Sequence, residues 1–231
     1  MNQETFKHQL SVFTTRDLNV VIAQFETYLA RLIEVNKVMN LTAITDPQEV
    51  FEKHFLDSCL IANHLKTGDK VADVGSGAGF PGLCLAIIRD DLHITLIEPT
   101  TKRCVFLQDV IKELGLNNVE VLNKRAEELG QLRESYDVVT ARAVAPLSIL
   151  LELCVPLVKV GGLMIAMKGQ KALEELSGAQ EAAKLLTLEV VEATPVTLPT
   201  AGLRVNLVFK KNKETKILYP RAYNQIKKNP L

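Results

Sequence analysis

The most informative segment of the chain is Asp73-Val74-Gly75-Ser76-Gly77-Ala78-Gly79-Phe80-Pro81-Gly82. It follows a short β-branched run over residues 71–74 and precedes a helical pattern over residues 81–88. Three glycines within five positions permit positive φ angles, and they let a ligand approach the backbone without a Cβ in the way. The N-terminus of the following helix adds unpaired N–H groups and a positive dipole. We interpret the segment as a ligand-binding loop between a strand and a helix.

The same alternation of short strands and helices continues after the loop. Strands are predicted at 71–74, 94–97, 119–122, 138–140 and 163–167, and helices at 81–88, 102–114, 146–157 and 173–186. Such alternation requires right-handed crossovers and a parallel sheet with both faces covered. Runs at 188–191 and 205–209 predict a final hairpin, which adds an antiparallel strand at or near an edge. The predicted class is α/β, with a mostly parallel, Rossmann-like sheet.

The first 65 residues are predicted to be helical. Thr14 and Asp17 have the spacing of a capping box, and apolar residues recur at helical spacing over residues 25–39. Asp46 followed by Pro47 predicts the start of another helix. We therefore divide the chain into an N-terminal helical extension (1–65), a ligand-binding domain (66–210) and a basic C-terminal tail (211–231). The tail is expected to pack on or near the same domain.

Charge is balanced overall but not along the chain. Lys plus Arg and Asp plus Glu both total 27, which argues against a broad basic face for nucleic acid. Residues 210–231, however, hold seven bases and one acid, a net charge of +6, which leaves −6 for the rest. A mildly acidic body is thus predicted to end in a basic tail.

Composition also limits the class of protein. With 47% apolar residues, the chain can bury a full core. The longest apolar run, residues 83–88, is far below the roughly 18 residues that a membrane span needs. The N-terminus lacks the pattern of a signal peptide, so we expect a cytoplasmic protein. Four widely spaced cysteines without a C-x-x-C pair predict buried, reduced thiols and no metal site.

Two classes of cofactor compete for the glycine loop. Residues 77–82 match the G-x-G-x-x-G of dinucleotide folds, with Glu98 about 20 residues further on. A strand-terminal acid followed by G-x-G-x-G is instead similar to class I S-adenosylmethionine (SAM) methyltransferases. The residues that carry this second pattern are Asp73, Gly75, Gly77 and Gly79.

The methyltransferase interpretation gives each neighbouring polar residue a role. Asp73 would serve the ammonium group of SAM. Glu98 ends the second predicted strand and would accept hydrogen bonds from the ribose hydroxyls. Ala126 and Glu127 follow the third strand, where methyltransferases of this fold contact adenine. A backbone N–H there would bond a ring nitrogen, and a carboxylate would accept from the exocyclic amine.

Motifs on both sides of the loop extend the resemblance over nearly the whole chain. They are Asn40-Leu41-Thr42, His54-Phe55-Leu56-Asp57-Ser58, Asp73 through Gly82, Arg125-Ala126-Glu127, Ala141-Arg142-Ala143-Val144-Ala145, Lys168-Gly169 and Tyr219-Pro220-Arg221. Together they resemble the bacterial glucose-inhibited division protein B family, which are SAM-dependent guanine-N7 methyltransferases of small-subunit (16S) rRNA. That family often follows Tyr-Pro-Arg with Gly-Thr-Pro, whereas Ala222-Tyr223-Asn224 stands here.

The resemblance implies a set of site residues, with SAM as cofactor and S-adenosyl-L-homocysteine as product. The implied SAM-binding positions are Gly75, Phe80, Glu98, Ala126, Glu127 and Arg142. Arg142, Lys168 and His54 are expected to position the substrate, Lys168 through a phosphate or the guanine O6. His54, Asp57 and Ser58 are expected to line the mouth of the pocket. They cannot act as a hydrolytic triad, because side chains side by side on one helix do not relay a proton in sequence.

The expected chemistry needs few catalytic groups. Guanine N7 carries an in-plane lone pair and no proton, so alignment supplies most of the catalysis and no general base is needed. The sequence agrees, since it lacks the Asn/Asp-Pro-Pro-aromatic motif of amino-group methyltransferases and any Pro-Cys dipeptide.

The expected partner is 16S rRNA or an assembling small subunit. The protein is expected to be a monomer that does not bind a membrane. The basic tail is expected to hold RNA phosphates, so that its removal weakens RNA binding and leaves SAM affinity nearly intact. Arg125, Arg142 and Lys168 are the other bases expected to contact RNA. Three alternatives stay open: a small-molecule SAM methyltransferase, an NAD dehydrogenase, and a SAM-fold RNA-binding protein without turnover.

Overall fold

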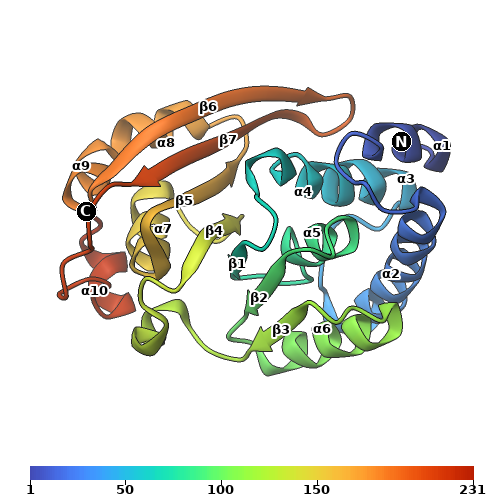
Figure 1. The fold of residues 1–231 in the computed structure, drawn as a ribbon, viewed down its shortest axis with the longest axis horizontal. Coiled ribbons are helices and arrows are strands. Elements are labelled where there is room, and N and C mark those ends of the chain that lie inside the picture. Colours follow the sequence, from blue (N-terminus) through green and yellow to red (C-terminus); the bar gives the residue numbers. More distant parts are fainter.

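A seven-stranded sheet with the order β3-β2-β1-β4-β5-β7-β6 forms the centre of the computed structural model, which describes all 231 residues (Figure 1). Its strands are β1 (Lys70–Val74), β2 (His93–Ile97), β3 (Val119–Leu122), β4 (Tyr136–Arg142), β5 (Val158–Lys168), β6 (Leu188–Leu198) and β7 (Gly202–Lys211). The first five are parallel, and β7 runs antiparallel between β5 and β6. The predicted α/β class and its antiparallel hairpin are confirmed.

Helices cover both faces of this sheet, with α1 to α6 on one side and α7 to α10 on the other (Figure 1). The first group is α1 (Gln3–Leu10), α2 (Leu18–Met39), α3 (Pro47–Val50), a π-helical turn (Phe51–Leu56), α4 (Asp57–Cys59), a 3₁₀ turn (Ala62–His64), α5 (Gly82–Ile88) and α6 (Thr101–Leu114). The second is α7 (Leu147–Cys154), α8 (Ala172–Gly178), α9 (Gln180–Leu185) and α10 (Tyr223–Lys228). Short 3₁₀ turns lie at Ala126–Glu128, Gly130–Leu132 and Val155–Leu157.

Three local predictions differ from the structure. Asp17 alone caps α2, by accepting from the Asn19 N–H at 2.8 Å, whereas the Thr14 hydroxyl donates to the Ile88 carbonyl instead. The helix predicted over residues 173–186 is two helices, because the first ends at Gly178, a residue with low helix propensity. The tail contains α10, which no sequence pattern indicated.

Two apolar clusters form the core, one on each face of the sheet. Successive strand residues point to opposite faces, so Val138 belongs to the first cluster and Val139 to the second. The first cluster joins the N-terminal helices to α5 and α6, and aromatic rings dominate it: Phe25 and Phe55 lie 4.9 Å apart, and Tyr28 stacks on Phe55 at 5.2 Å. Residues 1–65 therefore help to bury one face of the sheet.

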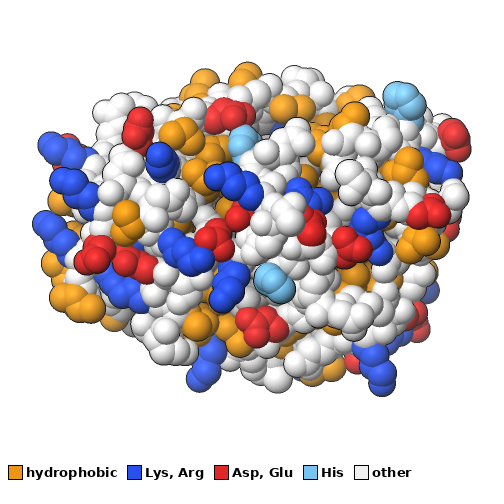
Figure 2. Space-filling view, in the orientation of Figure 1, with side chains coloured by type: hydrophobic (Ala, Val, Ile, Leu, Met, Phe, Trp, Pro, Cys, Tyr) orange, Lys and Arg blue, Asp and Glu red, His pale blue; other side chains and the backbone are white.

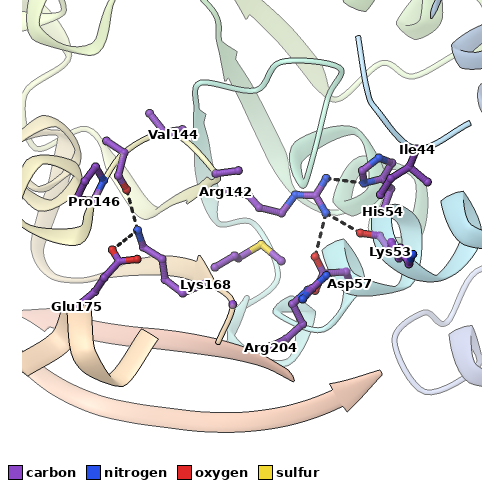
Figure 3. Close-up of a pocket in the computed structure, with 14 residues that line it drawn as sticks. Ile44, Lys53, His54, Asp57, Arg142, Val144, Pro146, Lys168, Glu175 and Arg204 are labelled. Carbon is purple, nitrogen blue, oxygen red and sulfur yellow. Dashed lines mark hydrogen bonds and ion pairs between the residues drawn. The ribbon is translucent and has the colours of Figure 1, made fainter. Parts of the chain in front are cut away.

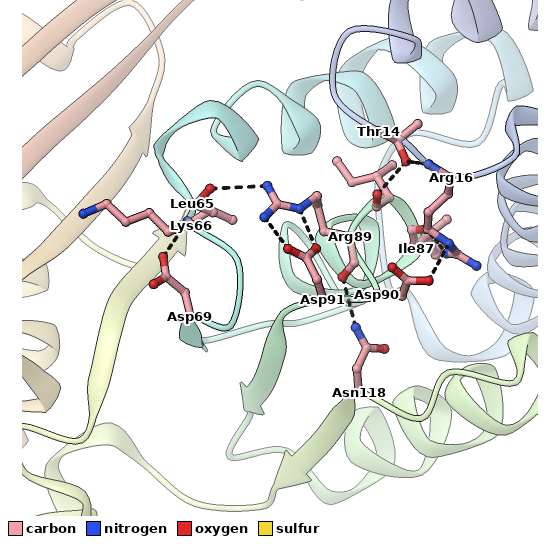
Figure 4. A network of polar contacts seen from close by, with 11 residues as sticks. Thr14, Arg16, Leu65, Lys66, Asp69, Ile87, Arg89, Asp90, Asp91 and Asn118 are labelled. Carbon is pink, nitrogen blue, oxygen red and sulfur yellow. Dashed lines mark hydrogen bonds and ion pairs between the residues drawn. The ribbon is translucent and has the colours of Figure 1, made fainter.

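A polar network fastens the segment between α1 and α2 to the end of α5 (Figure 4). Thr14 and Arg16 donate to the carbonyls of Ile88 and Ile87, which are among the last carbonyls of α5 and have no partner within that helix. The Arg16 guanidinium also lies 3.3 Å from the Asp90 carboxylate. The N-terminal segment thus fixes the helix that begins at the glycine loop.

All four cysteines are buried and unpaired. No helix combines the length and apolar character needed to cross a membrane. No group of three or more His, Cys, Asp or Glu side chains is arranged to hold a metal ion.

Candidate active site

The glycine loop leaves β1 and enters α5 with three glycines at positive φ. Gly75 has φ +72°, and a Cβ there would lie 2.6 Å from Val144 Cγ2. Gly79 has φ +103°, and its Cβ would lie 2.5 Å from Leu83 Cδ1 and 2.7 Å from the Tyr28 hydroxyl. Both positions therefore need glycine for two independent reasons, backbone conformation and space. The loop thus forms a cradle of bare backbone that has no room for a side chain at Gly75 or Gly79.

Two buried acids hold this loop in shape. Asp73 Oδ2 accepts from the Gly82 N–H at 2.9 Å, while its Oδ1 has no partner. Burial raises the pKa of Asp73 to about 7, against the lowering effect of the Gly82 hydrogen bond. Glu98 accepts from the N–H groups of Gly77 at 2.9 Å and Thr100 at 2.8 Å. Because a carboxylate has about four acceptor positions, Glu98 keeps capacity for further donors.

A cavity of about 550 Å³ opens at the carboxyl ends of β4 and β5 (Figure 3); we call it the larger cavity. Open α/β sheets place ligands at this end of their strands. Half of its 14 lining residues have charged or titratable side chains: Lys53, His54, Asp57, Arg142, Lys168, Glu175 and Arg204. The structure thus brings together three residues that the sequence placed far apart, namely His54, Arg142 and Lys168.

Arg142 is the centre of a polar network within the larger cavity (Figure 3). Its guanidinium donates to Asp57 Oδ2 at 2.9 Å and to the Lys53 carbonyl at 3.2 Å. It also lies 3.2 Å from His54 Nδ1 and 4.9 Å from the centre of the Phe80 ring. Arg204 Nε lies 3.4 Å from the second oxygen of Asp57, so one buried carboxylate faces two guanidinium groups.

His54 is held as a neutral ring. Its Nε2 lies 2.7 Å from the Thr42 hydroxyl, and its ring stacks on Phe80 at 4.5 Å. Burial and the nearby Arg142 charge lower the pKa of His54 to about 3. Because Arg142 can only donate, His54 Nδ1 is the acceptor and Nε2 carries the proton toward Thr42. Both ring nitrogens are therefore engaged.

Lys168 lies across the larger cavity from Arg142 (Figure 3). Its ammonium donates to the Ala145 carbonyl at 2.7 Å and to Glu175 Oε2 at 2.8 Å. The same Glu175 oxygen accepts from the N–H of Leu147, the first residue of α7. Lys168 is thus already paired, whereas the sequence analysis expected its ammonium to be available to a phosphate or to guanine O6.

A second cavity of about 190 Å³, the smaller cavity, lies beside the loop. Ala126 and Glu127, which the sequence analysis assigned to adenine, line it together with Gly75. Ala126 begins a 3₁₀ turn, so its N–H has no partner within that turn. Val144 lines both cavities, which therefore meet at this side chain.

Some predicted roles do not agree with the structure. Ser58 does not line the cavity, because it is fully buried and its hydroxyl donates to the His54 carbonyl. Lys211 is not available to RNA, since it is 0% exposed and its ammonium contacts Glu134 at 2.8 Å. Arg221 is likewise used internally, because it forms two side-chain hydrogen bonds with the buried Glu152.

Several residues of the two cavities were given no role by the sequence, among them Lys53, Val144, Arg204 and Tyr223. Lys53 precedes the motif that begins at His54, and Val144 lies within the motif around Arg142, so their neighbourhood in the sequence indicated them. Tyr223 lies where the chain departs from Gly-Thr-Pro, and the departure itself marked the position. Arg204 lies in a strand with no motif, so nothing in the sequence indicated it.

The chain is similar to known proteins over most of its length. A family model described as rRNA small subunit methyltransferase G (GidB) matches residues 21–201, which is most of the chain. The chain belongs to this family. A ribosomal RNA small subunit methyltransferase G from Mycoplasma capricolum is 46% identical over 202 residues, covering 87% of both chains. The protein of that name from Lactobacillus delbrueckii subsp. bulgaricus is 43% identical over 239 residues, covering both chains completely.

Solved structures support the fold of this methyltransferase G family member. A SAM-dependent methyltransferase from Aquifex aeolicus matches with a TM-score of 0.56 and 18% identity, covering 73% of this chain and 96% of that one. TYW2 from M. jannaschii, solved in complex with AdoMet, matches with a TM-score of 0.52 and 18% identity over 63% of this chain and 70% of that one. The predicted family and the class I methyltransferase fold are both confirmed, and the dehydrogenase alternative is not supported.

Proposed function

We propose that this protein is a SAM-dependent methyltransferase that methylates N7 of a guanine in 16S rRNA. The observation that carries the proposal is the meeting of two cavities at Val144, one beside the glycine loop and one lined by cations. In this proposal the cofactor occupies the smaller cavity and directs its methyl group past Val144 toward a base held in the larger one. Family membership supplies the reaction class, and the larger cavity supplies the place for the base.

The smaller cavity and the loop fit SAM. The cradle at Gly75 lacks room for a Cβ, and the orphaned Asp73 Oδ1 is a buried acceptor that suits an ammonium group. SAM supplies a methyl group that its sulfonium already activates. In this proposal Gly75, Gly77, Gly79 and Phe80 shape the backbone around the cofactor. Asp73, Glu98, Ala126, Glu127 and Arg142 provide its polar contacts.

Every titratable side chain of the larger cavity that could remove a proton is already paired. His54 has both nitrogens engaged, Asp57 faces two guanidinium groups and Glu175 holds Lys168. A general base would need a free acceptor within reach of the substrate. Guanine N7 has no proton to lose, so this arrangement suits N7 chemistry, in which alignment dominates.

The paired side chains then serve to position the base. Arg142, Lys168 and His54 are the positioning residues, because they present N–H groups or a flat ring to the cavity. Methylation turns the guanine into a cation. The carboxylates of Asp57 and Glu175 lie in the same cavity and would stabilise that developing charge.

RNA would reach the site over a surface of mixed charge. Figure 2 shows Lys and Arg side chains interspersed with acids on this face and gathered at the left edge, over α9, α10 and the end of β7. Five of the seven bases in residues 210–231 are exposed: Lys210, Lys213, Lys216, Lys227 and Lys228. A local basic edge with no broad basic face favours a ribosomal particle or a structured RNA as the substrate. We infer that a monomer performs this reaction in the cytoplasm.

Transfer of labelled methyl groups tests the function. The purified protein, labelled SAM and small subunits from cells that lack the enzyme should give labelled 16S rRNA with the label on guanine N7, and S-adenosyl-L-homocysteine as product. Label on a small molecule instead would favour the small-molecule alternative. RNA binding without any labelled product would favour a binding protein, and either outcome would reject the proposal.

A further inference from the structure

The C-terminal segment is firmly docked on the second core. Tyr219 and Ile226 are 8% and 0% exposed and belong to that core. The Arg221 side chain donates to both oxygens of the fully buried Glu152, at 2.8 Å from Nε and 2.6 Å from Nη2, and its backbone N–H adds a third bond at 3.0 Å. Charge-assisted, two-point pairing of this kind fixes orientation as well as distance. The segment therefore has one defined position.

Arg133 adds a second attachment from another part of the chain. Its guanidinium donates to the carbonyls of Tyr219 at 2.7 Å and Lys216 at 2.9 Å, and also to that of Thr215. These contacts satisfy three carbonyls in a segment without regular structure. The segment that leads to α10 is thus held on both sides of Tyr219.

This docking places Tyr223 in the wall of the smaller cavity. Tyr223 is the first residue of α10, yet it lines the same cavity as Gly75, Ala126 and Glu127, which lie much earlier in the chain. The guanidinium of Arg125 lies 5.8 Å from the centre of its ring, which is within the range of a cation–π contact. The cavity therefore has an aromatic wall that comes from the C-terminal segment.

The chemistry of the smaller cavity suits a flat heteroaromatic amine. Its walls are mostly apolar, with an aromatic ring, a carboxylate at Glu127 and the free N–H of Ala126. At about 190 Å³ it is smaller than the usual 300–1,000 Å³ of a site for a whole ligand, so it fits one ring system of a longer molecule. Aromatic side chains bind purines by offset stacking or edge contacts.

We propose that Tyr223 is a cofactor-binding residue that closes the adenine end of the SAM site, so that docking of the C-terminal segment contributes to cofactor affinity. This inference rests on the proposed function, because it takes SAM to be the ligand. It also changes the role of the tail, which the sequence assigned to RNA alone. The tail then contacts both the cofactor, through Tyr223, and RNA, through its lysines.

Calorimetry with S-adenosyl-L-homocysteine and with adenosine tests the role of the ring. Tyr223→Ala should weaken both ligands by about tenfold or more, the loss expected when an aromatic partner of a base is removed. Tyr223→Phe should bind as the wild type does, because the ring is kept. Asn224→Ala, an exposed neighbour on the same helix, is the matched control and should also bind normally.

A tryptophan reporter provides a readout that does not depend on affinity. The chain contains no Trp, so Tyr223→Trp would hold its only indole. Its fluorescence should change on titration with S-adenosyl-L-homocysteine, whereas that of Ile217→Trp, at an 89% exposed position of the same segment, should not. An unchanged signal from position 223 would contradict contact with the ligand.

The outcomes separate this inference from the function on which it rests. If the wild type binds neither ligand, the proposed function fails. If the wild type binds and folded Tyr223→Ala binds equally well, only the role of Tyr223 is rejected. Circular dichroism of each variant establishes that the protein is folded, and a variant that loses its fold is replaced by the Tyr223→Leu change, which keeps an apolar side chain in the core-facing segment.

Discussion

The smaller and larger cavities are neighbours, but they are built in different ways. The smaller one is lined mostly by apolar side chains together with Gly75, and its predicted residues lie within a few positions of a strand end. The larger one is made of charged side chains that pair across the fold, such as Arg142 with Asp57 and Arg204 with the same carboxylate. The contrast indicates that the cofactor side depends on local conformation, whereas the substrate side depends on long-range electrostatics.

The largest expected effect is at Gly75. Gly75→Ala would place a Cβ 2.6 Å from Val144 Cγ2 and force a non-glycine residue to φ +72°. We expect a loss of about 1–3 kcal/mol in the free energy of unfolding from backbone strain, together with at least about 100-fold weaker binding of S-adenosyl-L-homocysteine. Urea denaturation and calorimetry measure the two effects.

Gly115 is a matched control that separates the effect of backbone strain from that of the steric clash with Val144. Gly115 has φ +65°, and a Cβ there would meet no atom within 4 Å. Gly115→Ala should therefore lose stability but keep ligand affinity. Equal ligand affinity in the Gly75→Ala and Gly115→Ala variants would contradict the role of the loop as a cradle.

The next effect is expected in the larger cavity, at Arg142. Arg142→Gln would remove the closest cation from the buried Asp57, so we expect unfolding to become easier by about 3 kcal/mol. Methyl transfer to RNA should fall by about 100-fold because the base is no longer aligned. Urea denaturation and single-turnover methylation report these quantities. The double variant Arg142→Gln/Asp57→Asn should recover part of the stability, since the buried Asp57 carboxylate is gone and only the partly exposed Arg204 loses a partner.

A more exposed arginine, Arg31, is the control for that prediction. Arg31 pairs with Glu34 at 2.8 Å, but its side chain is 32% exposed and that of Glu34 is 66% exposed. Arg31→Gln should change the free energy of unfolding by less than about 1 kcal/mol. If Arg142→Gln changed the free energy of unfolding as little as Arg31→Gln, the larger cavity would not depend on its ion pairs.

The two cavities also differ in their expected response to pH. His54 has a pKa of about 3 in the folded protein, below its ordinary 6.5, so its contribution to stability is present above pH 6.5 and is lost as the pH falls toward 3. Asp73 has a pKa of about 7, above its ordinary 3.8, so its contribution is present below pH 3.8 and is lost as the pH rises toward 7. Between pH 3.8 and 6.5 the two contributions therefore have opposite slopes.

Substitutions can separate these slopes. Relative to the wild type, His54→Asn should gain about 1 kcal/mol of unfolding free energy when the pH is lowered from about 7 to about 5.5. Asp73→Asn should show the opposite trend over the same range, because the wild type gains stability as Asp73 takes up a proton and this variant does not. Urea denaturation at a series of pH values measures both. Parallel pH profiles for all three proteins would show that neither group titrates as described.

The smallest effect concerns the exposed lysines of the tail. Changing three of them to Gln should reduce the slope of log affinity for RNA against log salt by about 2, because each lost phosphate contact removes about 0.7–0.9. The three tail positions are Lys213, Lys216 and Lys227, and the control set of exposed lysines elsewhere is Lys37, Lys66 and Lys112. Filter binding to 16S rRNA at several salt concentrations gives the slopes. Equal slopes for the two sets would remove the tail from the RNA surface.

Much of the fold could be predicted from the sequence, because glycines, apolar alternation and turn residues act within short segments. The glycine loop, the strand that contains Asp73 and the strand that Glu98 follows lie where the sequence put them. Strand β3 has the predicted bounds, since apolar alternation and flanking turns set its ends. In contrast, α10 was missed because its single buried apolar residue, Ile226, gives no periodic pattern.

The sequence by itself determined the class of fold, the cofactor loop and the family, because glycine conformation, strand patterning and motif spacing are properties of short segments. Only the tertiary structure decided which charges pair. It buried Lys211 against Glu134, tied Lys168 to Glu175 and carried Tyr223 to the loop. The physical reason is that the partners of a charged side chain come from distant segments, which only the folded chain brings together. Burying an unpaired charge is costly, so the packing of those segments decides which charges pair.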